Sequence, residues 1–294
     1  MKLALGTVQF GLNYGVSNKL GQPSIAKAHA ILDIAKDAGI TTLDTALGYG
    51  ESHQVLASYP SINDCFNIVT KLPPLQKEQF SNQDADNYIA LIEQCFSDFK
   101  TQKLNAILFH QASDIEKQGV APVLACLKQR QLENQLASKG VSLYSGAEVD
   151  SFTQLSEINL VQIPYNAFDT YFKDTGALSL LSKNNTQVHA RSCFLQGLLL
   201  MPIDELASYF KPWKQNLESF HQLAQHLGVS ALTLSLAYAL KEDEIDKIVV
   251  GVNSESELEQ ILEAYQSSIK ISHDVLKEMT VNDPRLTNPA NWQL

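Results

Sequence analysis

Eight short β-prone runs that alternate with amphipathic segments predict that this chain of 294 residues is an α/β protein, a single (β/α)8 or TIM barrel. Such alternation is typical of parallel strands joined by crossover helices. Eight repeats over about 250 residues suit a closed barrel, with an open doubly wound sheet as the alternative. The hydrophobic content of 45% is sufficient for a large core.

The strand candidates are short and rich in apolar and β-branched residues. In chain order they cover residues 3–5, 41–43, 67–70, 106–109, 140–143, 160–163, 187–190 and 247–250. Between them, apolar residues recur at three- and four-residue spacing, which predicts helices over residues 25–38, 86–99, 122–130, 178–182 and 231–240. Residues 195–222 are expected to form an irregular excursion over the barrel mouth, and the tail after Pro284 is expected to be non-helical.

The chain offers little support for a second domain or a Rossmann fold. Gly6, Gly11 and Gly15 follow the first strand candidate but do not form GxGxxG. No linker rich in Pro, Gly or Ser interrupts the sequence. One domain over residues 1–294 is therefore predicted.

Composition excludes several partners. The formal net charge is -10, and no block of Lys and Arg suggests binding to nucleic acid or to an anionic membrane. The amino-terminal apolar run is too short for a signal peptide, and no run reaches the ~20 apolar residues that span a bilayer. The four cysteines lie far apart, which indicates reduced thiols in a cytoplasmic protein: Cys65, Cys95, Cys126 and Cys193.

Four reactive side chains follow three successive strand candidates. Asp44 and Tyr49 follow the second, Lys71 the third and His110 the fourth. Taken singly, they could be a helix cap, a packed ring, a solvated amine and a core histidine. Because the carboxyl ends of barrel strands meet at one mouth, their joint placement favours a shared site.

This set suits the transfer of a hydride and a proton to a carbonyl. A phenol has a pKa near ~10, and the ammonium of Lys71 is expected to lower the pKa of Tyr49, making it the proton donor. Asp44 would orient Lys71, and His110 would share the proton or steer the carbonyl. The hydride must come from a nicotinamide cofactor, because no side chain stores one.

These residues lie in motifs that resemble the aldo-keto reductase family. The motifs are LDTALGYGES at residues 43–52, VTKL at 69–72 and ILFHQ at 107–111. The similarity continues through KGVSLYS, VQIPYNAFD, ARSCFLQGLLL and IVVGVNSESELEQI. The resemblance implies a barrel with an Asp, Tyr, Lys and His tetrad and an NAD(P)H cofactor.

The resemblance also implies which residues hold this cofactor. Ser142 and Gln162 would bind the nicotinamide carboxamide, and residues 190–197 would lie along the pyrophosphate. The resemblance implies further cofactor contacts from the segment at residues 190–197 and from the end of the last strand. These residues are Arg191, Ser192, Phe194, Gln196, Gly197, Gly251, Ser254, Glu257 and Gln260.

Three departures from the family pattern concern the cofactor. Leu143 replaces an Asn that contacts the carboxamide, and Arg191 replaces the Tyr that stacks on the nicotinamide. A stacked guanidinium would disfavour the cationic oxidised ring, although Arg191 could instead be a rim arginine paired with an acid. Residues 251–260 contain no basic residue, and Glu257 stands where an Arg grips the 2′-phosphate. NADH is therefore expected over NADPH, unless Glu255 and Glu257 only stabilise the first turn of a helix.

The substrate and the competing functions stay open. GTVQFGLNYGVSN and RSCFLQGLLL resemble a bacterial branch linked to sugar or surface-polysaccharide metabolism, which suggests a small aldehyde, ketone or sugar. Gln9, Phe10 and Tyr14 either line the pocket or pack. One alternative is an NAD(H)-binding regulatory sensor on the same barrel. A metal-dependent hydrolase is disfavoured, because no HxH or HExxH spacing occurs. A monomer is expected, with a dimer possible.

Overall fold

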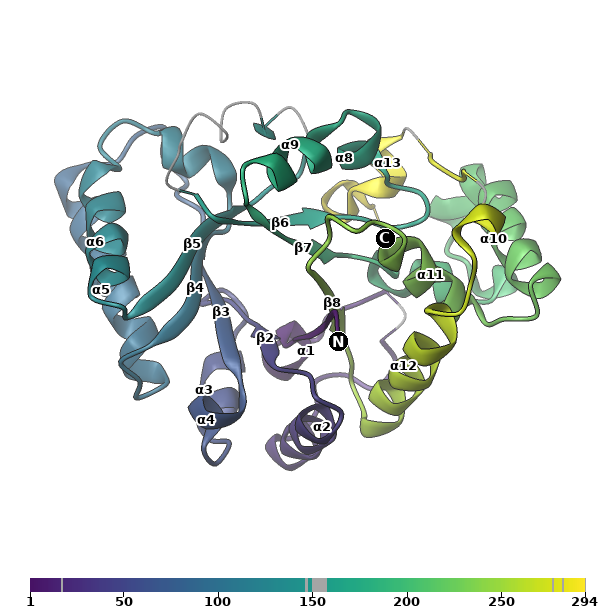
Figure 1. The fold of residues 1–294 in the computed structure, drawn as a ribbon, viewed down its shortest axis with the longest axis horizontal. Coiled ribbons are helices and arrows are strands. Elements are labelled where there is room, and N and C mark those ends of the chain that lie inside the picture. The colour runs from purple at the N-terminus through teal and green to yellow at the C-terminus, as the bar shows by residue number, and fades with distance from the viewer. Residues whose placement is uncertain (17, 146–147, 150–157, 277, 282, 294) are drawn as a thin grey trace.

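The barrel predicted from the sequence is the observed fold. A computed structural model describes residues 1–16, 18–145, 148–149, 158–276, 278–281 and 283–293. Eight parallel strands pair in chain order and close into a barrel, β1 pairing with both β2 and β8 (Figure 1). The strands are β1 (Leu3–Gly6), β2 (Thr42–Asp44), β3 (Asn67–Leu72), β4 (Leu104–Phe109), β5 (Leu136–Ser142), β6 (Leu160–Pro164), β7 (Gln187–Arg191) and β8 (Lys247–Gly251).

Helices surround the strands (Figure 1). The longer ones are α2 (Ile25–Asp37), α5 (Asn82–Asp98), α6 (Ala121–Leu132), α9 (Ala177–Lys183), α10 (Lys214–His226), α11 (Ala231–Leu240) and α12 (Glu255–Ser268). The shorter helices and 3-10 turns are α1 (Val8–Gly11), α3 (Ser52–Ala57), α4 (Ile62–Cys65), η1 (Ala112–Glu116), α8 (Tyr171–Asp174), η2 (Leu195–Leu200), η3 (Ile203–Glu205), η4 (Ser208–Trp213), η5 (His273–Val275), α13 (Pro284–Thr287) and η6 (Pro289–Asn291). Serine side chains cap α2, α5, α11 and α12 by accepting a backbone N–H of the first turn.

Two expectations about the second half of the chain are corrected. The segment after β7 is irregular only as far as the 3-10 turns η2 to η4, and it becomes the regular helix α10 at Lys214. The tail beyond Pro284 is not wholly non-helical, because it forms α13 and η6. Packing stabilises these short turns. The Trp292 and Phe210 rings meet edge to face, with their centroids 4.9 Å apart.

Alternation along the strands decides which side chains face the inside of the barrel. On β7, Val188 and Ala190 pack in the outer core between strands and helices, so His189 and Arg191 point inward. On β3, Val69 belongs to a small interior cluster, and Lys71, two residues on, shares its face. The same alternation turns Asp44 inward, because Leu43 packs outward. The strands thereby deliver polar side chains to one end of the barrel interior.

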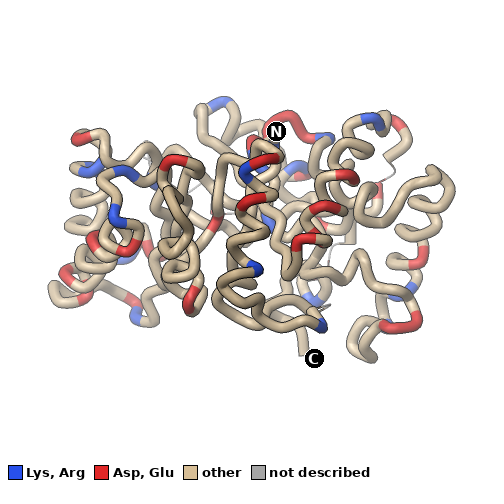
Figure 2. The backbone as a smooth tube through the Cα atoms, turned by 90° about the horizontal axis from the view of Figure 1, so that it is seen from below, with Lys and Arg blue, Asp and Glu red and all other residues tan. Residues whose placement is uncertain are grey.

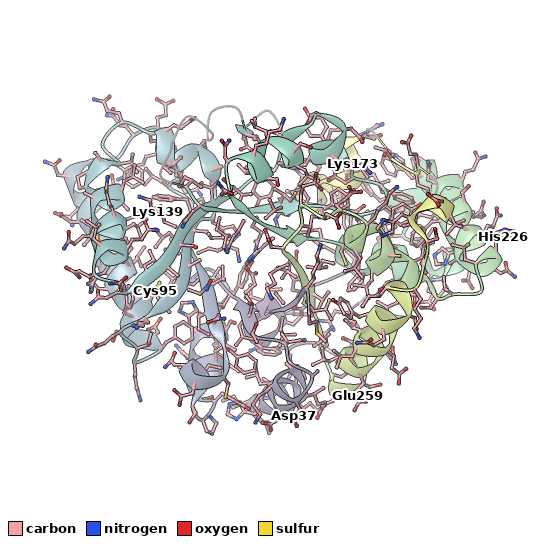
Figure 3. The ribbon with its side chains drawn as sticks, viewed as in Figure 1. Asp37, Cys95, Lys139, Lys173, His226 and Glu259 are labelled. Atoms are coloured by element: carbon pink, nitrogen blue, oxygen red, sulfur yellow. The ribbon has the colours of Figure 1, made fainter. Side chains whose placement is uncertain are left out.

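Charged residues lie mainly on the outside. Acidic and basic residues are interspersed over the molecule (Figure 2). The labelled Asp37, His226 and Glu259 lie at the periphery, on α2, α10 and α12 (Figure 3). All four cysteines are free thiols. Among the described residues no single helix has the length and apolar character to cross a membrane, although the bent pair Ser208–His226 and Ala231–Leu240 passes on those two measures with a 93° bend.

Candidate active site

A cavity of about 520 Å³ opens at the carboxyl ends of the strands. Most of the side chains predicted from the sequence line it: Asp44, Tyr49, His110, Gln162, Arg191, Ser192, Phe194, Gln196, Gly197, Gly251, Glu257 and Gln260. Lys71, Ser142 and Ser254 are not part of its wall. Within the described chain, no three His, Cys, Asp or Glu side chains are grouped so as to hold a metal ion.

Asp44 and Lys71 form a buried ion pair beneath the cavity. Lys71 Nζ donates to both carboxylate oxygens of Asp44 at 2.8 Å and to the carbonyl of Thr45 at 2.9 Å. Gln162 Nε2 donates to the same carboxylate at 2.7 Å. Burial lowers the pKa of Lys71, and the Asp44 charge opposes that shift. Because each charge is matched, the pair can remain in a position where a lone ammonium would be costly.

Tyr49 lies on a tight loop between β2 and α3. Gly11 and Gly50 let this loop approach α1 closely, since a Cβ built on Gly11 would overlap the carbonyl oxygen of Tyr49. Beneath the loop, Ser52 Oγ donates to the carbonyl of Thr7 at 2.9 Å, and Thr7 Oγ1 donates to the carbonyl of Asp44 at 3.0 Å. These contacts fix the backbone that carries the phenol.

The phenol lies beside both Lys71 and His110. Lys71 Nζ is 3.5 Å from Tyr49 Oη and 5.1 Å from the centre of its ring. The Tyr49 and His110 rings meet edge to face, with centroids 5.9 Å apart. The four side chains predicted to act together are therefore close together.

The expected lowering of the Tyr49 pKa is wrong. Burial, followed by the negative charge of Asp44, raises the pKa of Tyr49 above its ordinary value, and Arg191 opposes this shift. The ammonium of Lys71 is held against both oxygens of Asp44, so its field at the phenol is offset. The hydroxyl consequently keeps its proton at neutral pH.

His110 is neutral at physiological pH. Burial, followed by the positive charges of Lys71 and Arg191, lowers the pKa of His110 to about 4. A neutral imidazole has one donor and one acceptor nitrogen. It can therefore hydrogen-bond to a carbonyl oxygen or to the phenol without adding charge to the site.

Ser142 and Gln162, which were expected to hold a carboxamide, lie at the ends of neighbouring strands in register. Ser142 Oγ is buried without a hydrogen-bond partner among the described residues. The Leu143 side chain packs in the outer core, so this residue presents only its carbonyl oxygen. A hydroxyl without a partner could hydrogen-bond to a ligand amide, although Ser142 is not among the residues that line the cavity.

Arg191 contacts the β5 loop. Its guanidinium donates to the carbonyl of Leu143 at 3.1 Å and lies over the Tyr144 ring at 4.4 Å from the centroid. Among the residues that the structure describes, Arg191 is not paired with an acid, so the alternative of a rim arginine in an ion pair is not the arrangement found there. The following loop, from Ser192 to Gly197, has several residues with positive φ, Ser192 and Gln196 at 62° and 52° among them.

The last strand leads into a capped helix. Ser254 Oγ accepts the Glu257 backbone N–H at 3.2 Å and caps α12. Glu257 Oε2 accepts the Asn253 backbone N–H at 2.7 Å, so this carboxylate both faces the cavity and stabilises the helix start. Asn253 Oδ1 is buried without a partner among the described residues. Hydrogen-bond acceptors therefore predominate on the part of the cavity wall that follows β8.

Several lining residues were not predicted. Thr7, Tyr144 and Asn253 lie just after strand ends, so the rule that located Asp44 could have found them. Leu232 reaches the cavity from α11, and no signal in the sequence indicates this. Of the three residues that could either line the pocket or pack, Gln9 and Tyr14 line the cavity and Phe10 is buried in the core.

Comparisons with known proteins agree with this architecture. A model of the aldo/keto reductase family matches residues 2–281. No curated protein sequence matches significantly. A crystal structure of a proposed aldo-keto reductase from Pseudomonas aeruginosa is similar, with a TM-score of 0.67 and 19% identity over 92% of this chain and 91% of that one. A second structure of a proposed aldo-keto reductase from the same organism has the same TM-score and identity, over 92% and 90% of the two chains. At this identity, both show a common fold.

Proposed function

This chain belongs to the aldo/keto reductase family, an assignment that makes it an oxidoreductase of carbonyl compounds, and we propose that it reduces a small aldehyde or ketone with Tyr49 as proton donor. The observation that carries the proposal is the 3.5 Å separation between Tyr49 Oη and Lys71 Nζ at the base of the cavity. As the carbonyl oxygen gains negative charge, Tyr49 gives it a proton, and Lys71 stabilises the phenolate that remains. Neutral His110 orients the same oxygen.

The cofactor is a nicotinamide dinucleotide, which when bound supplies the hydride. Two side chains at the strand ends support this assignment: Ser142, whose hydroxyl has no partner among the described residues, and the neighbouring Gln162. NADH is preferred over NADPH, because Glu257 on the cavity wall repels a 2′-phosphate and can accept a hydrogen bond from a free 2′-hydroxyl. A sugar substrate, one domain, a cytoplasmic location and a monomeric state stay predictions from the sequence.

The test is to incubate the protein with NADH or NADPH and a panel of aldehydes, ketones and sugars, following the absorbance of the reduced nicotinamide. Turnover with at least one carbonyl, faster with NADH, is expected. If NADH binds but no carbonyl is reduced, the protein is a nucleotide sensor on the same barrel and the proposal fails.

A further inference from the structure

Arg191 is the one cation among the described residues that line the cavity. It ends β7 on the inward face, because Ala190 packs outward. Its side chain extends past the end of β6 to the loop after β5, where it contacts Leu143 and Tyr144. The guanidinium therefore lies over the barrel interior rather than in solvent.

Among the described residues the guanidinium of Arg191 forms no ion pair, although its charge opposes the rise that burial causes in the pKa of Asp169. The hydrogen bonds of Arg191 are to neutral oxygens, the Leu143 carbonyl at 3.1 Å and the Ser192 hydroxyl at 3.5 Å. In the described part of the chain, no carboxylate lies within salt-bridge distance of it. A guanidinium has five N–H donors, so these two bonds leave three for a ligand.

The other charges near Arg191 act differently at Tyr49 and at His110. At Tyr49 the negative charge of Asp44 outweighs the positive charge of Arg191, although Asp44 is paired with Lys71 at 2.8 Å. At His110 the positive charges of Lys71 and Arg191 outweigh the negative charge of Asp44. Arg191 therefore adds positive charge to the part of the cavity that Tyr49 and His110 share, although the protein as a whole carries a net charge of -10.

We propose that Arg191 binds an anionic group, a carboxylate or a phosphate, on the carbonyl substrate whose oxygen meets Tyr49. A half-buried, unpaired cation is costly unless a ligand compensates it, and the planar fork of a guanidinium matches both anions. Its attachment to Leu143 and Tyr144 holds the fork in place before binding, which reduces the entropy lost. This inference rests on the proposed reductase function and names its substrate class.

The same guanidinium could meet an anion from another source, the diphosphate of the cofactor. The two sources differ in what the loss of Arg191 changes. A substrate contact affects the selectivity between charged and neutral substrates. A cofactor contact weakens NADH binding and leaves that selectivity unchanged.

The experiment compares matched carbonyls with the wild type, Arg191→Gln and a control, Arg130→Gln. The control removes an arginine that pairs with Glu93 and does not line the cavity. The substrate pairs are succinic semialdehyde with butyraldehyde, glucuronate with glucose, and glyceraldehyde phosphate with glyceraldehyde. kcat/KM is measured for each, and the Kd of NADH by fluorescence titration.

In the wild type, the anionic member of at least one pair should be favoured by about 10- to 100-fold, the range of a charge-assisted hydrogen bond. Arg191→Gln should reduce that ratio to near one whatever its effect on the Kd of NADH, and Arg130→Gln should retain it. Equal rates for charged and neutral members in the wild type would overturn the inference while leaving the reductase function intact. Weaker NADH binding with an unchanged ratio would assign Arg191 to the cofactor instead.

A binding measurement keeps the inference testable if no carbonyl is turned over. Calorimetry with succinic semialdehyde and butyraldehyde, in the absence of cofactor, does not depend on catalysis. Tighter binding of the anion to the wild type, lost in Arg191→Gln, supports an anion site at Arg191 even if the reductase function fails. Absence of that difference overturns it.

Discussion

The protonation state of Tyr49 depends on how its neighbours divide their charges. Asp44 binds both the ammonium of Lys71 and the amide of Gln162, so Lys71 stabilises Asp44 more than it acidifies the phenol. A raised pKa keeps the proton on Tyr49 until negative charge develops beside it. In the proposed mechanism, Tyr49 therefore releases its proton only to a strongly basic oxygen.

We predict that Glu257 determines the preference for NADH over NADPH. In Glu257→Arg, a repelling carboxylate becomes a cation, so the ratio of the NADPH Kd to the NADH Kd should fall by about 10- to 100-fold. Fluorescence titration of both cofactors measures the ratio. Glu259→Arg makes the same charge change at an exposed site on α12 (Figure 3) and serves as the control. An unchanged ratio in Glu257→Arg would mean that Glu257 only stabilises the helix start.

At the scale of single residues, the sequence predicts where a side chain lies in the barrel better than it predicts which side chains it contacts. Asp44, Lys71 and His110 were identifiable because each lies at or just after the carboxyl end of a strand, and strand ends converge at the barrel mouth. The sequence did not predict the direction of the Tyr49 pKa shift or the packing of Arg191 on Tyr144, because both depend on distances between segments that are remote in the chain. Ser254 also illustrates this, since its hydroxyl caps α12 and does not line the cavity.

At the scale of elements, the approach of α1 to the loop after β2 positions the phenol. A methyl group at Gly11 would overlap the carbonyl oxygen of Tyr49 and crowd the N–H of Ser52. Gly11→Ala should therefore displace the loop, lower kcat/KM at least tenfold and destabilise the fold by about 1–3 kcal/mol. Gly48→Ala, in the same loop, is the control for stability only, because a Cβ there meets nothing within 4 Å but Gly48 lines the cavity. An equal free energy of unfolding in the two variants would contradict this role for the close approach.

The strands were predictable as elements, whereas parts of the second half were not. Short apolar runs bounded by helical periodicity identified all eight strands, although β5 begins earlier, at Leu136. The helix α10 was overlooked within an irregular segment, even though Leu217, Phe220 and Ala224 recur at helical spacing. The turn α13 spans only four residues and depends on the Asp283 cap and on tertiary packing, which local sequence does not reveal.

At the scale of the whole molecule, the barrel interior holds a buried histidine as well as an apolar cluster. His189 is 4% exposed, and its Nδ1 has no partner among the described residues. Burial lowers its pKa from 6.5 to about 4, while Asp44 and Asp246 oppose that shift. The interior must therefore hold His189 in its neutral form.

This burial makes stability depend on pH. Between pH 6.5 and about 4, the unfolded chain protonates His189 but the folded chain does not, so the free energy of unfolding falls as the pH falls. His189→Gln should remove up to about 3 kcal/mol of that loss between pH 7 and pH 4, measured by urea unfolding. His226→Gln, at an exposed position on α10, should keep the wild-type pH dependence. Parallel pH profiles for His189→Gln and the wild type would argue against a buried neutral imidazole.

The central claim is that Tyr49 donates the proton that accompanies hydride transfer. The most direct test is a single-turnover measurement with prebound NADH and a reducible aldehyde, comparing the wild type with Tyr49→Phe. The account predicts a rate about 10²- to 10⁴-fold slower in the variant, with the Kd of NADH within twofold of the wild-type value. An unchanged rate of hydride transfer in Tyr49→Phe would contradict it.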